Sequence, residues 1–133
     1  MTLSDKLQSQ DWTRGDLLAE QCPSRVVLKH VTSRWGVLIL MILEKEQTMR
    51  FSDLRRRIGG VSERMLAQSL KWLEQDGFVN RFAHSVVPPH VEYSLTPMGM
   101  EVAAHVRKLA DWIETKLPEI SQHWNNIAKH RNT

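Results

Sequence analysis

The stretch from residue 49 to residue 96 constrains the fold more than any other part of this chain. It reads MRFSDLRRRIGGVSERMLAQSLKWLEQDGFVNRFAHSVVPPHVEYSLT. Two segments with helical periodicity are separated by a pair of glycines and followed by two segments with the alternation of β-strands. This order predicts a mostly helical unit that carries one β-hairpin.

The first helical segment, FSDLRRRI, places three apolar side chains on its inner face, namely Phe51, Leu54 and Ile58. Ser52 can cap the start of this helix, and Arg55 points to the opposite, solvent-facing side. Gly59 and Gly60 end the helix, because glycine adopts the positive φ that other residues resist.

The second helical segment begins after Ser62, whose hydroxyl can cap it. Its inner face consists of three leucines at helical spacing, Leu66, Leu70 and Leu73. The opposite face, called the donor face below, consists of four long side chains that can donate hydrogen bonds: Arg64, Gln68, Lys71 and Gln75. Such side chains reach base edges or phosphates in a DNA groove. Gly77 ends the helix.

Two short strands follow the second helix. One face of the first strand carries Val79, Arg81 and Ala83, and one face of the second carries Val91, Tyr93 and Leu95. Pro88 and Pro89 cannot join a central ladder, so they belong to the exposed loop between the strands. Helix, turn, helix and hairpin in this order define a winged helix-turn-helix, whose wing is this loop. DNA binding is therefore the first functional hypothesis.

Length and composition set the broad class of the protein. The 133 residues suffice for one domain with terminal extensions, and the net charge of +3 agrees with a polyanionic partner. The single cysteine, Cys22, excludes an intrachain disulfide framework. The first residues lack the apolar core of a signal peptide, and the longest apolar run, residues 37–43, is too short to span a bilayer. We expect a soluble cytoplasmic protein without membrane contact.

Catalytic motifs are absent from the sequence. The six histidines show no HExxH spacing, and neither a glycine-rich phosphate loop nor a GxSxG motif occurs. His84 and His90 flank the wing loop and can approach each other across the hairpin, but two histidines without a third ligand rarely hold a metal ion. We therefore expect no enzymatic activity, no cofactor and no metal.

The sequence predicts three parts of the chain: an N-terminal arm (1–21), the winged domain (22–96) and C-terminal dimerisation helices (97–133). The arm is polar and predicted to be loosely held. Pro23 opens a helix to about His30, and Thr32 or Ser33 caps the next, RWGVLILMIL. This helix is apolar on all sides, which predicts the buried centre of the core, with Trp35 as a packing residue.

The C-terminal part predicts two helices, one from Pro97 to about Leu117 and one after Pro118. The first has an apolar stripe at helical spacing: Val102, Val106, Leu109, Ile113 and Leu117. Such a stripe needs a partner to cover it. A second subunit is the preferred interpretation, and packing on the Trp35 helix of the same chain is the alternative.

Together these residues resemble the HxlR-type transcriptional regulators, a family of small winged-helix proteins. The resemblance runs from Cys22 to about Leu117, through the Cys22-Pro23 pair, the Trp35 helix, residues 50–81 and the segment PPHVEYSLTPMG. It implies a homodimeric regulator, more commonly a repressor, that binds an inverted-repeat operator. Residues 62–71 would read the major groove, and the wing would follow the backbone or minor groove. Family members commonly have Arg or Lys where His90 stands, which weakens the expected charged contact near neutral pH.

The residues expected to contact double-stranded DNA are Ser52, Arg55, Ser62, Glu63, Arg64, Gln68, Lys71 and His90. The family also commonly has a cysteine where Cys22 stands, and some members use it to sense oxidants or electrophiles. A thiol at a helix N-terminus, with Arg25 nearby, favours the reactive thiolate. A small packing residue is the equal alternative. A sensing Cys22 would act through an intersubunit disulfide or a mixed thiol adduct. A small-molecule inducer is compatible with the sequence, which does not identify one.

A competing hypothesis is a winged helix that binds protein or RNA without operator specificity. The donor face has no aromatic residue at its centre, unlike the hot spots of protein interfaces. The hairpin offers only Phe82 and Tyr93 for stacking on RNA bases. Duplex DNA is therefore the expected partner.

Overall fold

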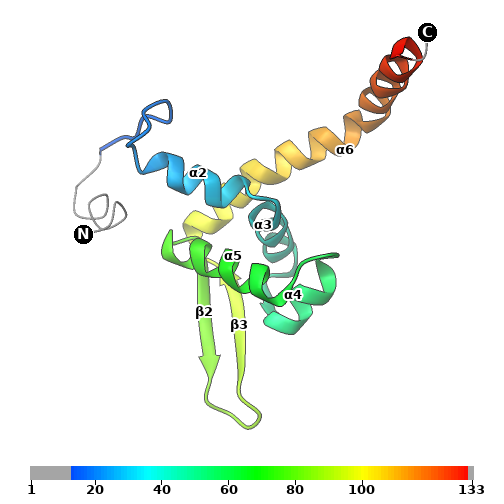
Figure 1. Ribbon diagram of the computed structural model, residues 1–133. Helices are drawn as coiled ribbons and strands as arrows, with labels where there is room; N and C mark the ends of the chain where they lie inside the picture. Colours follow the sequence, from blue (N-terminus) through cyan, green and yellow to red (C-terminus); the bar gives the residue numbers. More distant parts are fainter. Residues whose placement is uncertain (1–12, 132–133) are drawn as a thin grey trace.

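The structure is a computed structural model, and it describes residues 13–131. Its elements are, in chain order, α2 (Ser24–Thr32), α3 (Arg34–Glu46), β1 (Thr48–Arg50), α4 (Phe51–Arg57), α5 (Glu63–Gln75), β2 (Val79–His84), β3 (His90–Leu95) and α6 (Pro97–Arg131). The helices form the body, β2 and β3 project from it as a hairpin, and α6 runs out of the body to the C-terminus (Figure 1). The predicted class, mostly helical with a small wing, is confirmed.

The hydrophobic core is centred on α3, which packs against α5, β3 and α6. The largest fully buried side chains are Ile39, Leu40, Leu43, Leu54, Leu66, Leu70 and Leu73. Ser33 caps α3 as expected, since its hydroxyl accepts a hydrogen bond from the Gly36 amide at 3.1 Å. The expectation that α3 is buried on every side is confirmed only in part, because Ile39, Leu40 and Leu43 are fully buried whereas the apolar residues around them are half-buried. Trp35 and Met41 are half-buried and pack against the core, which agrees with the predicted packing role of Trp35.

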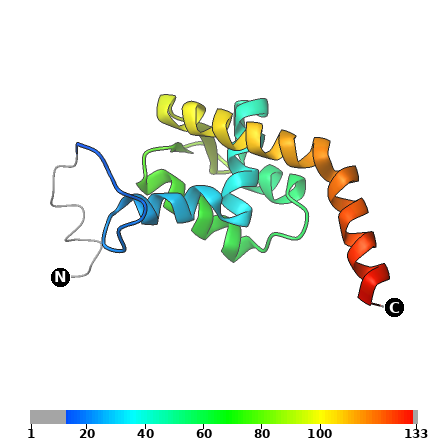
Figure 2. The same cartoon turned by 90° about the horizontal axis from the view of Figure 1, so that it is seen from above.

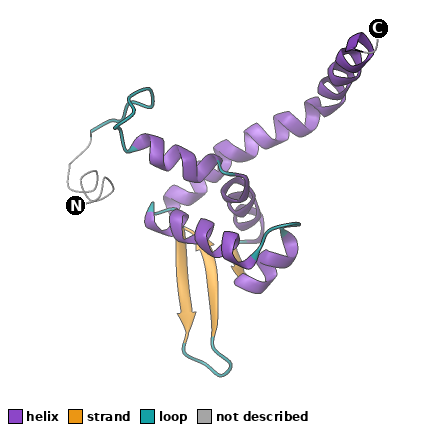
Figure 3. Ribbon diagram, in the orientation of Figure 1, coloured by secondary structure: helices purple, strands orange, loops and turns teal. Residues whose placement is uncertain are grey.

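A third strand, β1, was not predicted. The sheet order is β1-β3-β2 with antiparallel pairing throughout, and Arg50 of β1 lies opposite Glu92 of β3 (Figure 3). Three residues are too few to show strand alternation in a sequence. Because β1 runs directly into α4, Arg50 occupies the N-cap position and Ser52 lies inside the helix. The predicted capping by Ser52 is therefore wrong.

The hairpin has the predicted faces. Val79 lies opposite Leu95, Arg81 opposite Tyr93 and Ala83 opposite Val91. Of these, Val79 and Tyr93 are buried, which fixes this face toward the body. Gly77, with φ of 86°, makes the sharp turn from α5 into β2.

The C-terminal part is one helix of 35 residues, not two, with Pro118 inside it. An internal proline removes one backbone hydrogen bond and crowds the preceding turn, which bends a helix without ending it when the flanking residues continue the pattern. α6 changes direction in its second half (Figure 2). Ala103 and Val106 belong to the core, whereas Leu109, Ile113 and Leu117 are exposed. α6 thus begins as a core helix and continues as an exposed arm.

Two expectations concern the N-terminus and membranes. Residues 13–21 form turns and loop, and the remainder of the predicted arm, residues 1–12, lies outside the described residues. Within residues 13–131, no single helix combines the length and apolar character that a membrane span requires. The helices α2 and α3 have the required length and apolar character only when they are taken together, and this pair is bent by 72°.

Candidate nucleic-acid interface

The donor face of α5 is exposed, as predicted. Ser62 caps the helix, since its hydroxyl accepts a hydrogen bond from the Met65 amide at 3.1 Å. Behind the donor face, Leu66, Leu70 and Leu73 are at most 1% exposed. In front, every predicted contact on this helix and its cap is exposed: Ser62, Glu63, Arg64, Gln68 and Lys71. The buried leucines fix the rotation of α5 about its axis, so these polar side chains point away from the core.

The predicted contacts on α4 lie beside the start of α5. Ser52, Arg55 and Glu63 line one surface hollow together with Phe51 and Arg56. The Arg55 Nη1 atom is 3.9 Å from Glu63 Oε2, and both side chains are more than half exposed, so this ion pair is weak. Arg55 is therefore available to an anion that approaches the hollow.

A second hollow lies between α5 and the wing. Lys71 and Arg81 line it together with Ala67, Glu74 and Tyr93. Arg81 was not among the predicted contacts. The strand alternation of β2 places Arg81 on the same face as Val79, which packs toward α5. This alternation alone would have been sufficient to predict that Arg81 lies beside α5.

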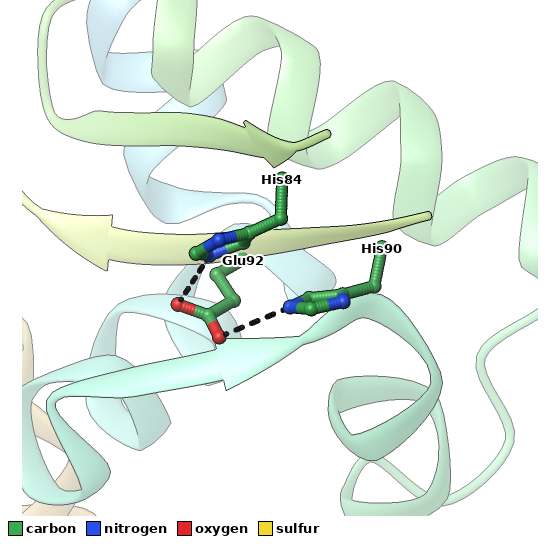
Figure 4. Close-up of side chains that lie close together, drawn as sticks. All are labelled: His84, His90 and Glu92. Atoms are coloured by element: carbon green, nitrogen blue, oxygen red, sulfur yellow. Dashed lines mark ion pairs between the residues drawn. The ribbon is translucent and has the colours of Figure 1, made fainter. Parts of the chain in front are cut away.

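The wing carries a cluster of three side chains where β2 and β3 meet the loop (Figure 4). The rings of His84 and His90 stack with centroids 4.3 Å apart, and Glu92 Oε1 lies 3.5 Å from His90 Nε2. The approach of His84 holds the pKa of the Glu92 carboxyl below its ordinary value, and the charges of His90 and Arg50 act in the same direction. His90 is half-buried in this cluster, and the exposed wing loop consists of residues 85–89. A contact between His90 and DNA stays a prediction.

A pair of side chains that sequence reasoning missed anchors the end of α5. His30 Nδ1 of α2 lies 2.6 Å from Asp76 Oδ2 at the C-cap of α5, and both side chains are nearly buried. The His30 ring also stacks on Trp72, at 5.0 Å between centroids and 10° between planes. Because 46 residues separate the two partners, no local pattern could reveal the contact. It ties α2 to the helix that carries the donor face.

Cys22 lies directly before α2 and is only 5% exposed. Its Sγ accepts hydrogen bonds from Ser24 Oγ at 3.0 Å and from the Asp16 amide at 3.1 Å. These donors lower the pKa of the Cys22 thiol, Ser24 most strongly, because they stabilise the thiolate. Arg25 bonds to the carbonyls of Leu17 and Leu18 and thereby holds the loop over the thiol. Cys22 is thus packed at the start of α2 and has, at the same time, a thiol whose pKa is lowered.

The helices α4 and α5 with the β2–β3 hairpin define a winged helix-turn-helix protein. The model of the HxlR-like helix-turn-helix family matches residues 30–121, and the chain belongs to this family. It is therefore a helix-turn-helix transcriptional regulator of the HxlR type, a class of DNA-binding proteins and not of enzymes.

Individual relatives agree with this assignment. A protein of Escherichia coli (strain K12), described as the HTH-type transcriptional regulator YtfH, is 71% identical over 112 residues, which are 84% of this chain and 88% of that protein. The structure of ytfH from Salmonella typhimurium, described as a transcriptional regulator, is similar with a TM-score of 0.81 at 66% identity, covering 84% of this chain and 99% of that one. The redox regulator HypR in its reduced form has a TM-score of 0.67 at 30% identity, covering 75% of this chain and 98% of that one.

Proposed function

We propose that this regulator binds an inverted-repeat operator as a homodimer in the cytoplasm and represses transcription. The observation that carries the proposal is the exposed donor face of α5, which three buried leucines hold outward beside the wing. A helix with such a face suits the major groove, where arginine, glutamine and lysine read base edges or bind phosphates. Arg55 and the wing loop lie on either side and suit the phosphate backbone.

The exposed half of α6 supports the dimer. Its large exposed apolar side chains are Leu109, Trp112, Ile113, Leu117, Trp124 and Ile127. An apolar surface of this extent marks an interaction site in a water-soluble protein, and a second α6 would cover it. Two copies also supply the specificity that one recognition helix lacks, since each good base contact contributes only about 1–3 kcal/mol of discrimination. Half-sites should then be centred about one helical turn, or a multiple of it, apart.

Two variants test the DNA interface. The operator is first recovered by sequencing genomic fragments that the protein retains, and its affinity is then measured over a series of salt concentrations. Arg64→Ala and Lys71→Ala should each weaken binding, and loss of a phosphate contact should reduce the log–log salt slope by about 0.9. Lys108→Ala, at an exposed lysine of α6, is the control of equal charge. Unchanged affinity and slope in both α5 variants would refute the interface, and preference for single-stranded RNA over duplex DNA would favour the competing hypothesis.

The dimer has its own measurement. Sedimentation equilibrium at micromolar concentration should give twice the mass of the chain. Replacing Ile113 and Leu117 by lysine should give a folded monomer, because two charges would enter the apolar interface. A monomeric wild-type protein would reject the homodimer.

We further infer that Cys22 switches the regulator. Its thiolate is stabilised, and the similar protein HypR is described as a redox regulator. Two Cys22 thiols, one from each subunit, would lose two protons and two electrons to an oxidant such as diamide and form one S–S bond. An electrophile would form one C–S bond and release the thiol proton. Either product would remove the hydrogen bonds from Ser24 and Asp16 that hold the start of α2, the helix joined to α5 through His30.

The switch is tested with operator binding before and after diamide, with and without later reduction. Wild-type protein should lose affinity reversibly and run at twice its mass on a non-reducing gel, and Cys22→Ser should do neither. An equal diamide response in Cys22→Ser, or none in the wild type, would leave Cys22 as a packing residue.

A further inference from the structure

The wing cluster of His84, His90 and Glu92 has the composition and geometry of a metal site. His84 and His90 end β2 and begin β3 and lie directly opposite each other, so both rings stand on one face of the hairpin. Glu92 is two residues further along β3 and therefore on the same face. Figure 4 shows its carboxylate reaching toward both rings. The pairing register alone brings the three side chains together.

The distances match those between ligands of one ion. Glu92 Oε2 lies 3.1 Å from His84 Nε2, and Glu92 Oε1 lies 3.5 Å from His90 Nε2. Candidate ligand atoms of all three residues lie within 4.8 Å of one another. Two ligands bound to a tetrahedral Zn²⁺ at ordinary bond lengths are separated by about 3.4 Å. Small side-chain rotations therefore suffice to converge the three groups on one ion.

A buried nitrogen in this cluster lacks a hydrogen bond. Among the residues that the structure describes, His84 Nε2 is one of two buried side-chain polar atoms without a hydrogen-bond partner. Glu92 Oε2 approaches this nitrogen at 3.1 Å, as an ion pair that requires a protonated ring. When the ring is neutral, the lone pair of this nitrogen faces the carboxylate without a donor, and a metal ion that accepts the lone pair would remove the cost.

We infer that His84, His90 and Glu92 bind a divalent transition metal ion of the zinc class. Two imidazole nitrogens and one carboxylate are ligands that zinc favours, and hard cations such as Mg²⁺ prefer oxygen ligands alone. Three protein ligands leave a coordination position open to water or to an anion. The third ligand, which the two histidines lack in the sequence pattern, is supplied by Glu92.

The position of the site suggests what the ion would do. It lies at the base of the exposed wing loop, and a bound ion would add two positive charges beside the Glu92 carboxylate. If the proposed function holds, the ion would give the wing the cationic contact to a phosphate that this chain otherwise lacks there. Operator binding should then be tighter with Zn²⁺ than without it.

Metal binding is tested directly on the full chain without an affinity tag. The protein is treated with a chelator, dialysed, and titrated with Zn²⁺ in competition with a chromophoric chelator. Wild-type protein should bind one ion per chain. Glu92→Gln and His84→Gln should each weaken binding at least about tenfold, because even the outer partners of a metal site contribute that much. Mg²⁺ at the same concentration should not compete.

Matched variants separate this site from other ligands. Cys22→Ser and Glu101→Gln should bind Zn²⁺ like the wild type, since neither residue belongs to the cluster. Far-ultraviolet circular dichroism checks that the wing variants are folded, and Zn²⁺ should raise the Tm of the wild type but not that of Glu92→Gln. Equal Zn²⁺ affinity in wild type, Glu92→Gln and His84→Gln would overturn the proposal.

Operator affinity with and without Zn²⁺ forms a separate arm. Tighter binding by the wild type but not by Glu92→Gln supports the link between the ion and the wing. Stoichiometric metal binding with unchanged operator affinity overturns that link and leaves the site in place. Failure to bind any duplex DNA would refute the proposed function, and the titration would still decide the metal site.

Discussion

The contact between His30 and Asp76 gives the most direct test of how the donor face is held. A carboxylate at the C-terminus of a helix is unfavourable by itself, because it faces the negative end of the helix dipole. Asp76 occupies that position in α5, with its carboxylate 2.6 Å from His30 Nδ1. His30→Ala removes the partner and leaves a nearly buried carboxylate at the wrong end of the helix. It also removes the ring that stacks on Trp72.

The expected cost follows from these two contacts. A hydrogen bond to a charged group contributes about 1.5–3 kcal/mol, and a stacked aromatic pair about 0.5–1.5 kcal/mol. The side chains of His30 and Asp76 are 10% and 13% exposed, so water replaces little of the lost hydrogen bond. We expect His30→Ala to reduce the free energy of unfolding by about 2–4 kcal/mol. Asp76→Ala should cost less, because the stack on Trp72 remains and the misplaced charge is gone.

Urea unfolding followed by circular dichroism measures both variants and the double variant. The protein concentration must be fixed, because the stability of a dimer depends on it. The double-mutant cycle formed by these variants should give a coupling energy of about 1–2 kcal/mol between His30 and Asp76. His105→Ala, at an exposed histidine of α6, serves as the control and should change stability by less than about 0.5 kcal/mol. A coupling energy near zero, or a loss no larger than that of the control, would refute the reasoning.

Three further predictions concern single contacts. Ser24→Ala removes the strongest cause of the lowered Cys22 pKa, so the midpoint of iodoacetamide alkylation should move to higher pH, and an unchanged midpoint would contradict the assignment. Ser62→Ala should cost about 1 kcal/mol in thermal unfolding through loss of the helix cap on the Met65 amide, and Ser62→Gly only a few tenths, with equal losses arguing against the cap. Leu70→Ala should cost about 2–5 kcal/mol in urea unfolding because it opens a cavity behind the donor face, and a loss below 1 kcal/mol would show that this side of α5 is not core.

The elements with a clear local period could be predicted from the sequence. The leucines of α5 recur at helical spacing, so the inner and donor faces of that helix were predictable without coordinates. The same holds for the faces of the hairpin, where alternation fixes which residues of β2 and β3 share a side. Ser62 was predictable as a cap, and Ser33 as one of two candidates with Thr32, because each precedes an apolar helical pattern.

What the sequence did not reveal depends on contacts between distant segments. The strand β1 forms by pairing with the edge of β3, which is distant in the sequence. His30 contacts Asp76 because α2 packs across the end of α5. Pro118 predicts the boundary between two helices, but the residues on both sides continue the helical pattern and a bend accommodates the proline. The third member of the wing cluster, Glu92, required the register of the strands and not only their existence.

The junction at Thr96 has a practical consequence. This residue is the only link between β3 and α6, and its hydroxyl donates to the Gly77 carbonyl at 2.5 Å while accepting from the Gly99 amide at 2.9 Å. A fragment that stops there would lose Ala103 and Val106 and with them one wall of the interior. A minimal fragment of this winged helix-turn-helix protein should therefore keep the chain through at least the first three turns of α6. In the proposed homodimer, the single residue Thr96 leaves no flexible linker between β3 and α6. A rotation of the exposed half of α6 would therefore also move α5 in both subunits.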